Sequence, residues 1–189
     1  MYRSIVMIAA LSLSTSAMAQ DFDPTRVRLL IHGSLEVKEN VELRAHFIPA
    51  GNLLGEVAPI LYLGVNFKPV EWLGFEPVVG WTFVTDEPIV SLRASPDFGL
   101  IYGWADIELN LPGLGGYWFV QADVRLLKWL HMGLEGEGWG SYYTDFFSNG
   151  GGPNLLLRYG KVGVDLAIHA REVNDSVGPG FVIRFHTFL

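Results

Sequence analysis

The chain has 189 residues, of which 50% are hydrophobic and 17% are charged, and it carries a net charge of −7 and no cysteine. This acidic balance argues against nucleic-acid binding, which needs basic patches that neutralise phosphates. Without cysteine the chain forms no disulfide framework, so a core or a membrane must hold it together. No segment after residue 20 has eighteen consecutive apolar residues, and we therefore expect no transmembrane helix.

The first nineteen residues have the pattern of a secretory signal peptide. Arg3 supplies a positive start, residues 5–13 are apolar, and Ala17 and Ala19 flank Met18 as a small-x-small cleavage site. We expect cleavage after Ala19, which leaves residues 20–189 as a single domain with twelve basic and twenty acidic residues. The alternative is a retained N-terminal anchor.

Apolar and polar residues alternate along most of the remaining chain. From Val27 to Val37 the odd positions are apolar or glycine, whereas Arg28, His32 and Glu36 stand at even positions. In every such segment the charged residues fall on one set of positions, and a helix would not keep this period of two. We therefore expect an all-β fold. The alternating segments are 27–37, 41–47, 59–67, 73–83, 90–94, 101–109, 118–126, 130–137, 155–159, 162–171 and 181–189.

The connections between these segments alternate between short and longer, which is typical of transmembrane barrels with short periplasmic turns and longer outer loops. The segment Gly150-Gly151-Gly152-Pro153 is expected to lie in a flexible outer loop; it lacks the ending of a phosphate-binding loop. The short connections are 38–40, 68–71, 95–97, 127–128 and 160–161. The longer connections, rich in Gly, Pro, Asn and Asp, are 49–56, 85–88, 110–115, 144–153 and 172–179.

The pattern therefore predicts an antiparallel up-and-down transmembrane β-barrel. Eleven segments are found, but single-chain bacterial barrels carry an even number of strands. We expect about ten strands, with the first segment outside the wall. Twelve strands would require one further segment, and eight would require several segments to merge.

The C-terminal segment resembles the β-signal that ends outer-membrane barrel proteins. Apolar residues stand at every second position back from the C-terminus, with one threonine among them. The set is Phe181, Ile183, Phe185, Thr187 and Leu189. The resemblance implies a place in outer-membrane lipid of a Gram-negative-type bacterium and insertion by the barrel-assembly machinery. The family usually ends on an aromatic residue, whereas here Leu189 is last and Phe188 is penultimate.

Tryptophans near the expected strand ends suggest aromatic belts at two membrane interfaces. Trp72 and Trp129 directly follow short lysine-bearing turns, and Trp81 and Trp139 stand about one strand length further on. Because Trp72, Trp129 and Trp139 fall on the polar set of positions, they could instead be lumen or turn residues.

The polar set of positions does not resemble a soluble surface, because it mixes Gly, Tyr and Trp with charges of both signs. We interpret it as the lumen face of the barrel, where a network of ion pairs fills and stiffens a narrow interior. The alternative is the polar lining of a pore. The predicted lumen residues are Glu42, Arg44, His46, Glu76, Arg93, Asp106, Glu108, Asp123, Arg125, Glu135, Glu137, Arg158, Asp165, His169, Arg171, Arg184 and His186.

We expect no enzymatic activity, although two other functions stay open. His169, with Asp165 and His186 nearby in the polar set and Ser176 in the following connection, suggests a lipid-modifying outer-membrane hydrolase. A soluble periplasmic barrel that binds an apolar ligand is the other alternative. No spacing typical of a metal site occurs, so we expect neither metal nor cofactor. The oligomeric state and the solute are left open.

Overall fold

The computed structural model describes residues 25–49, 59–83, 85–111, 115–141, 146–173 and 176–189. The predicted signal peptide, its cleavage site and nearly all of the predicted 49–56 loop lie outside these ranges. Within the described residues, no helix is long and apolar enough to cross a membrane.

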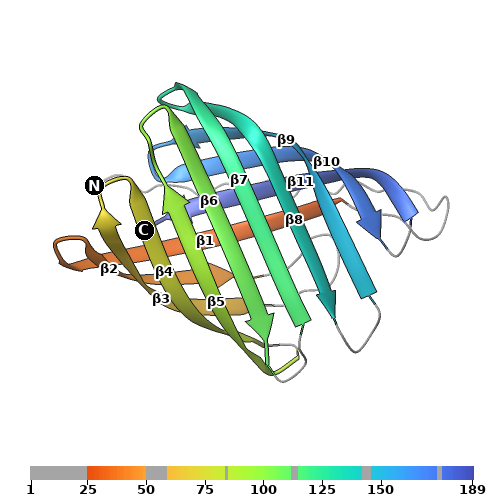
Figure 1. The fold of residues 1–189 in the computed structure, drawn as a ribbon, viewed down its shortest axis with the longest axis horizontal. Helices are drawn as coiled ribbons and strands as arrows, with labels where there is room; N and C mark the ends of the chain where they lie inside the picture. Colours follow the sequence, from red (N-terminus) through yellow and green to blue (C-terminus); the bar gives the residue numbers. More distant parts are fainter. Residues whose placement is uncertain (1–24, 50–58, 84, 112–114, 142–145, 174–175) are drawn as a thin grey trace, which may run out of the picture.

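The described chain is all-β, and its strands close into one barrel (Figure 1). Each strand pairs antiparallel with its neighbours in sequence, as the alternation and the turn signals predict. The strands are β1 (Arg26–Lys38), β2 (Val41–Ile48), β3 (Ile60–Val70), β4 (Leu73–Thr82), β5 (Glu87–Pro96), β6 (Ile101–Asn110), β7 (Gly115–Leu127), β8 (Leu130–Ser141), β9 (Phe146–Tyr159), β10 (Val162–Val173) and β11 (Ser176–Phe188).

The barrel has eleven strands, one more than the ten we expect, because the first segment belongs to the wall. Hairpin connections reverse the chain ten times, so β1 and β11 run in the same direction and close the barrel as a parallel pair. Their register runs from Arg26 opposite Val182 to His32 opposite Phe188. A parallel ladder still pairs the backbone groups of both strands, so an odd number of strands leaves no open edge.

The two ends of the barrel differ in their connections. We call the end where β1, β3, β5, β7 and β9 finish the short-turn end, and the opposite end the loop end. At the short-turn end, Asn40 and Gly160 have φ angles of 64° and 57°, the left-handed conformation that tight turns need. Lys38 and Lys161 lie at this same end, at the β1–β2 and β9–β10 turns.

The prediction of a flexible loop over residues 150–153 is wrong, because these residues form part of β9. Gly150 pairs with Glu137 of β8 and with Arg171 of β10. A Cβ atom at Gly150 would lie 3.1 Å from Cζ of Arg171, so the missing side chain makes room for that arginine inside the barrel. A run of glycines has no apolar alternation, and sequence periodicity therefore missed this half of the strand.

The two faces of the wall have opposite chemistry. Large apolar side chains point outward, and Ile107 and Leu134 keep 64% and 66% of their surface exposed. Charged side chains point inward, and Glu137 and Asp123 are fully buried. This is the reverse of a soluble barrel, whose apolar face would be turned inward.

Four of the six tryptophans point outward or lie in turns. Trp72 and Trp129 are exposed in the turns after β3 and β7, and Trp81 lies on the outer face near the loop end of β4. Trp118, which was not among the tryptophans assigned to the belts, also points outward, and its Nε1 donates a hydrogen bond to Oδ1 of Asn149 at 2.9 Å. Of the two interpretations left open for Trp139, the lumen one is correct, because Trp139 borders the cavity and the guanidinium of Arg26 lies 4.1 Å from its ring.

Candidate functional site: the charged lumen

A cavity of about 1480 Å³ runs through the barrel interior. Residues from both ends of the wall line it. Lys68, Asp97 and Arg158 line it at the short-turn end, whereas Glu87 and Asn110 line it at the loop end. The cavity therefore extends along the barrel axis, and the side chains that narrow it decide what the lumen can do.

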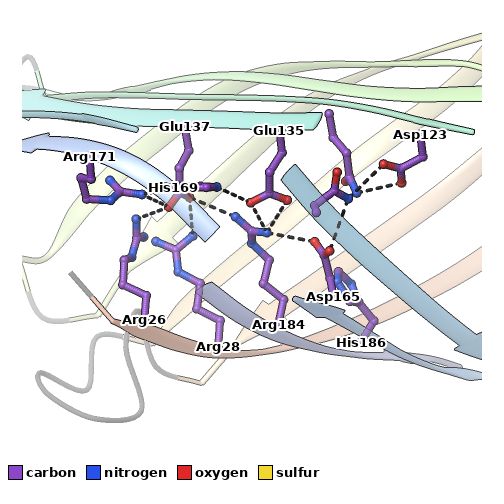
Figure 2. Close-up of polar contacts among 12 residues, drawn as sticks. Arg26, Arg28, Asp123, Glu135, Glu137, Asp165, His169, Arg171, Arg184 and His186 are labelled. Atoms are coloured by element: carbon purple, nitrogen blue, oxygen red, sulfur yellow. Dashed lines mark hydrogen bonds and ion pairs between the residues drawn. The ribbon is translucent and has the colours of Figure 1, made fainter. Parts of the chain in front are cut away.

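Glu137 of β8 lies at the centre of the largest ion-pair network. Its carboxylate accepts hydrogen bonds from Arg26 at 2.7 Å, from Arg171 at 2.6 Å and from Arg184 at 3.3 Å. Arg28 lies 3.8 Å away. Figure 2 shows these side chains converging on Glu137 from β1, β10 and β11. One fully buried carboxylate thus holds four guanidinium groups around it.

Arg184 links Glu137 to the next carboxylates along the lumen. Its Nη1 donates to both oxygens of Glu135 at 2.8 Å and to Asp165 at 2.9 Å. Nε2 of His169 lies 2.8 Å from Oε1 of Glu135. We call Arg26, Arg28, Glu135, Glu137, Asp165, His169, Arg171 and Arg184 the Glu137 cluster. Such buried charges stay ionised only when paired and hydrogen-bonded, which makes every member depend on the others.

Asp123 lies beyond this cluster on β7, also fully buried. Its carboxylate accepts hydrogen bonds from Asn154 and Gln121, both at 2.9 Å. Amide groups rather than cations therefore hold this carboxylate.

A second network covers the opposite wall of the barrel, on β2 to β6. Glu76 accepts a hydrogen bond from Arg44 at 3.2 Å, and Nε2 of His46 lies 2.7 Å from its other oxygen. Arg93 lies 4.0 Å from Glu76 and donates to Asp106 at 2.8 Å. We call Arg44, His46, Glu76, Arg93, Asp106 and Glu108 the Glu76 cluster. Its last member, Glu108, lies 3.4 Å from Arg93.

Glycine makes room for this second network as well. A Cβ atom on Gly64 of β3 would lie 2.7 Å from Oε1 of Glu76. The carboxylate therefore occupies the space that a side chain at this position would need.

Three histidines lie side by side on the adjacent strands β2, β1 and β11. Nδ1 of His32 lies 2.8 Å from Nδ1 of His46, and Nε2 of His32 lies 3.2 Å from Nδ1 of His186. The Phe188 ring stacks on His32, with 5.0 Å between the ring centroids. The Phe188 side chain thus points into the lumen.

At the short-turn end, Arg125 binds Asp97 and the carbonyl of Gly99. The guanidinium donates to both carboxylate oxygens, at 2.8 and 2.7 Å, and to Gly99 O at 2.7 Å. Hydrogen bonding from Arg125 lowers the pKa of Asp97 below its ordinary value. Both side chains are substantially exposed, so this is a surface ion pair rather than a buried one.

We expect Asp97→Asn to lower the free energy of unfolding by less than about 1 kcal/mol at neutral pH, because exposed ion pairs contribute little. Because the folded-state pKa is lowered, the carboxylate stabilises the fold above its unfolded pKa of about 3.9 and loses that effect as the pH falls through the folded value. Urea unfolding of both proteins at neutral and acidic pH measures this. A difference that grows toward acidic pH would contradict the assignment.

The predicted lumen residues all lie on the inner face, but they are not all alike. Glu76, Asp123, Glu135 and Glu137 are buried and do not border the cavity, whereas Arg158 borders it and is exposed. The sequence interpretation missed Arg26, Arg28, His32 and Tyr62. Arg28 and His32 could have been found, because they stand at the even positions of a segment that we placed outside the wall.

The structure does not assemble the hydrolase site that the sequence suggested. His169 is buried and lies opposite Gly180, whereas Ser176 is exposed and pairs with Val173 at the end of the hairpin. Four residues of strand, about 13 Å, separate the two positions. Among the described residues, no group of three histidine, cysteine or acidic side chains could hold a metal ion.

Comparison with known proteins finds no matching family model and no matching curated protein. The chemistry of the barrel itself therefore carries the functional argument.

Proposed function

We propose that this chain is an integral β-barrel protein of a bacterial outer membrane and that its lumen is a narrow polar pore. The observation that carries the proposal is the reversed distribution of side chains, apolar outside and charged inside. A protein dissolved in water would expose little contiguous apolar surface, because large exposed patches promote association. Surrounded by lipid, the same surface is the stable one.

The backbone supports the same proposal. In hydrocarbon every N–H and C=O must find a partner within the protein, and only helices and closed barrels achieve this. The β1–β11 pair closes the wall, so the sheet has no open edge. The exposed tryptophans lie toward the two ends of the barrel, where aromatic side chains suit the two membrane interfaces.

The proposal includes export across the inner membrane and assembly into the outer membrane. The predicted signal peptide would direct the chain across the inner membrane. In β11, Phe181 and Phe185 are outward and exposed, which is the surface that the proposed contact with the barrel-assembly machinery would use.

The cavity favours a narrow pore over a filled, purely structural barrel. Residues from both ends line it, and members of both ion-pair clusters border it. Small solutes fit such a passage, whereas the side chains that protrude into it exclude large ones. A soluble barrel with an apolar ligand is less consistent with the charged inner face.

Gel electrophoresis of the protein extracted from membranes with detergent, with and without boiling, tests the membrane proposal. We expect a folded species that changes its gel mobility only after boiling, and discrete conductance steps when this species enters a planar lipid bilayer. Soluble protein without a mobility shift would refute the membrane barrel. A shifting species without conductance would leave the membrane barrel and refute the pore.

A further inference from the structure

We infer that the lumen selects small anions over cations; this inference rests on the proposed pore and names its solute class. The chain as a whole is acidic, so its net charge would suggest the opposite. The arrangement of the charges within the barrel, and not their sum, carries the inference.

All eight arginines from Arg26 to Arg184 border the cavity. Together with Lys68 they present nine cationic side chains, against six aspartate and glutamate side chains on the same surface. The C-terminal residue, Leu189, also borders the cavity, and counting its carboxylate still leaves an excess of cations. Among the side chains that border the cavity, cations therefore outnumber carboxylates, although the chain as a whole is acidic.

The excess arises because three carboxylates of the two clusters do not border the cavity, whereas the arginines paired with them do. Glu76, Glu135 and Glu137 are 2%, 5% and 0% exposed, and none of them borders the cavity. Each is paired with arginines that themselves border the cavity, and Figure 2 shows the arginines around Glu137. Guanidinium groups keep their charge at any physiological pH and present five N–H donors each, more than their carboxylate partners can occupy.

The short-turn end carries the clearest anion contact. Arg158 lies over the Phe188 ring at 4.7 Å and, among the described residues, makes no ion pair with a carboxylate. His131 lies at the same end, 6% exposed, and its buried Nδ1 has no hydrogen-bond partner. A small anion at this mouth would therefore meet the Arg158 guanidinium, which no carboxylate of the described residues neutralises.

Electrostatics within a barrel strengthens this preference. A low-dielectric wall focuses the field of the groups that line a narrow passage and concentrates ions of the opposite sign there. Rings of arginine and lysine are a known means of building anion-selective pores. We therefore expect halides, inorganic phosphate and short carboxylates to enter, and monovalent cations to be disfavoured.

Quenching of lumen tryptophans tests the inference without requiring conductance. Replacing Trp72, Trp81, Trp118 and Trp129 with phenylalanine leaves Trp104 and Trp139, both of which border the cavity. Once the refolded barrel shows its heat-dependent mobility shift, we expect iodide to quench the remaining fluorescence several-fold more strongly than caesium. Equal quenching, or stronger quenching by caesium, would overturn the inference and leave the membrane barrel intact.

Arg158→Gln in this background should reduce quenching by iodide and leave quenching by caesium unchanged or raised. Lys161→Gln is the matched control, because it removes one positive charge from a turn at the same end but does not border the cavity. Equal effects of the two variants would show that bulk charge, and not the lumen, attracts the anion. Protection of both tryptophans from both ions would refute the pore together with its selectivity.

Reversal potentials in a potassium chloride gradient give the independent measurement for a conducting barrel. Chloride selectivity that falls in Arg158→Gln and persists in Lys161→Gln is the expected result. Potassium selectivity in the wild-type protein would refute the anion preference while confirming a pore. Failure of the anion preference and failure of the proposed pore therefore give different experimental results.

Discussion

Glu137→Gln is expected to lower the free energy of unfolding by about 3–5 kcal/mol, because removing one partner of a buried ion pair leaves the other charges uncompensated. Four arginines surround this one carboxylate, and the neutral amide of glutamine cannot offset their mutual repulsion. Urea titration of the refolded barrel in detergent, followed by tryptophan fluorescence, measures the change.

Glu42→Gln is the matched control for this prediction. Glu42 also pairs with an arginine, Arg44, but its side chain keeps 25% of its surface exposed and lies near the short-turn end. Solvent screens that pair, so we expect a loss of less than about 1 kcal/mol. Similar losses in the two variants would mean that water reaches Glu137 and that the buried network does not hold the barrel together.

A second substitution can separate repulsion from lost packing. Adding Arg28→Gln to Glu137→Gln removes one of the four cations, the one whose distance to Glu137 is longest, at 3.8 Å. We expect the double variant to be more stable than Glu137→Gln alone. Additive losses would show that the two residues do not interact in the way the geometry implies.

Leu134→Arg should destabilise the inserted barrel by about 2–4 kcal/mol, the cost of arginine on a lipid-facing strand near the bilayer midplane. Leu134 points outward from β8 and is 66% exposed. Refolding into lipid vesicles and measuring the folded fraction against urea gives the difference. In water the same substitution would change stability by no more than about 0.5 kcal/mol, since exposed surface positions tolerate exchange.

Tyr159→Arg provides the control for position in the membrane. Tyr159 also points outward, is 89% exposed, and is the last residue of β9 beside the Gly160 turn. Near a membrane interface arginine costs about 0–1 kcal/mol, so this variant should refold almost as well as the wild-type protein. A neutral Leu134→Arg would contradict a lipid-facing wall, and equal losses in both variants would contradict the assigned depth.

Alternation along the chain was sufficient to predict the fold class and the two faces of the wall. Residues such as Leu134 and Glu135 must point to opposite sides of a strand because successive side chains alternate. A closed wall then places one set inside and one set outside. The seventeen charged and histidine positions assigned to the lumen all lie on the inner face for this reason.

Local patterns failed where the side-chain signal was weak or where a general rule replaced it. Gly150 carries no side chain to mark its face, so the first half of β9 looked like a loop. Arg28 and His32 stood in a clear strand pattern, yet an expected even number of strands excluded them from the wall. Trp139 stands about one strand length beyond Trp129, as an interface residue would, but it lies in the lumen in contact with Arg26 and Arg171.

The sequence by itself determined that the chain alternates, that its charges share one face and that its strands are joined by turns, because these properties depend on neighbouring residues. Only the tertiary structure decided which charges meet. Glu137 and Arg26 are 111 residues apart in the chain and 2.7 Å apart in the barrel. Closure of β1 on β11 brings the first arginines beside the last strand. Such long-range register depends on how the whole sheet closes, which no local pattern records.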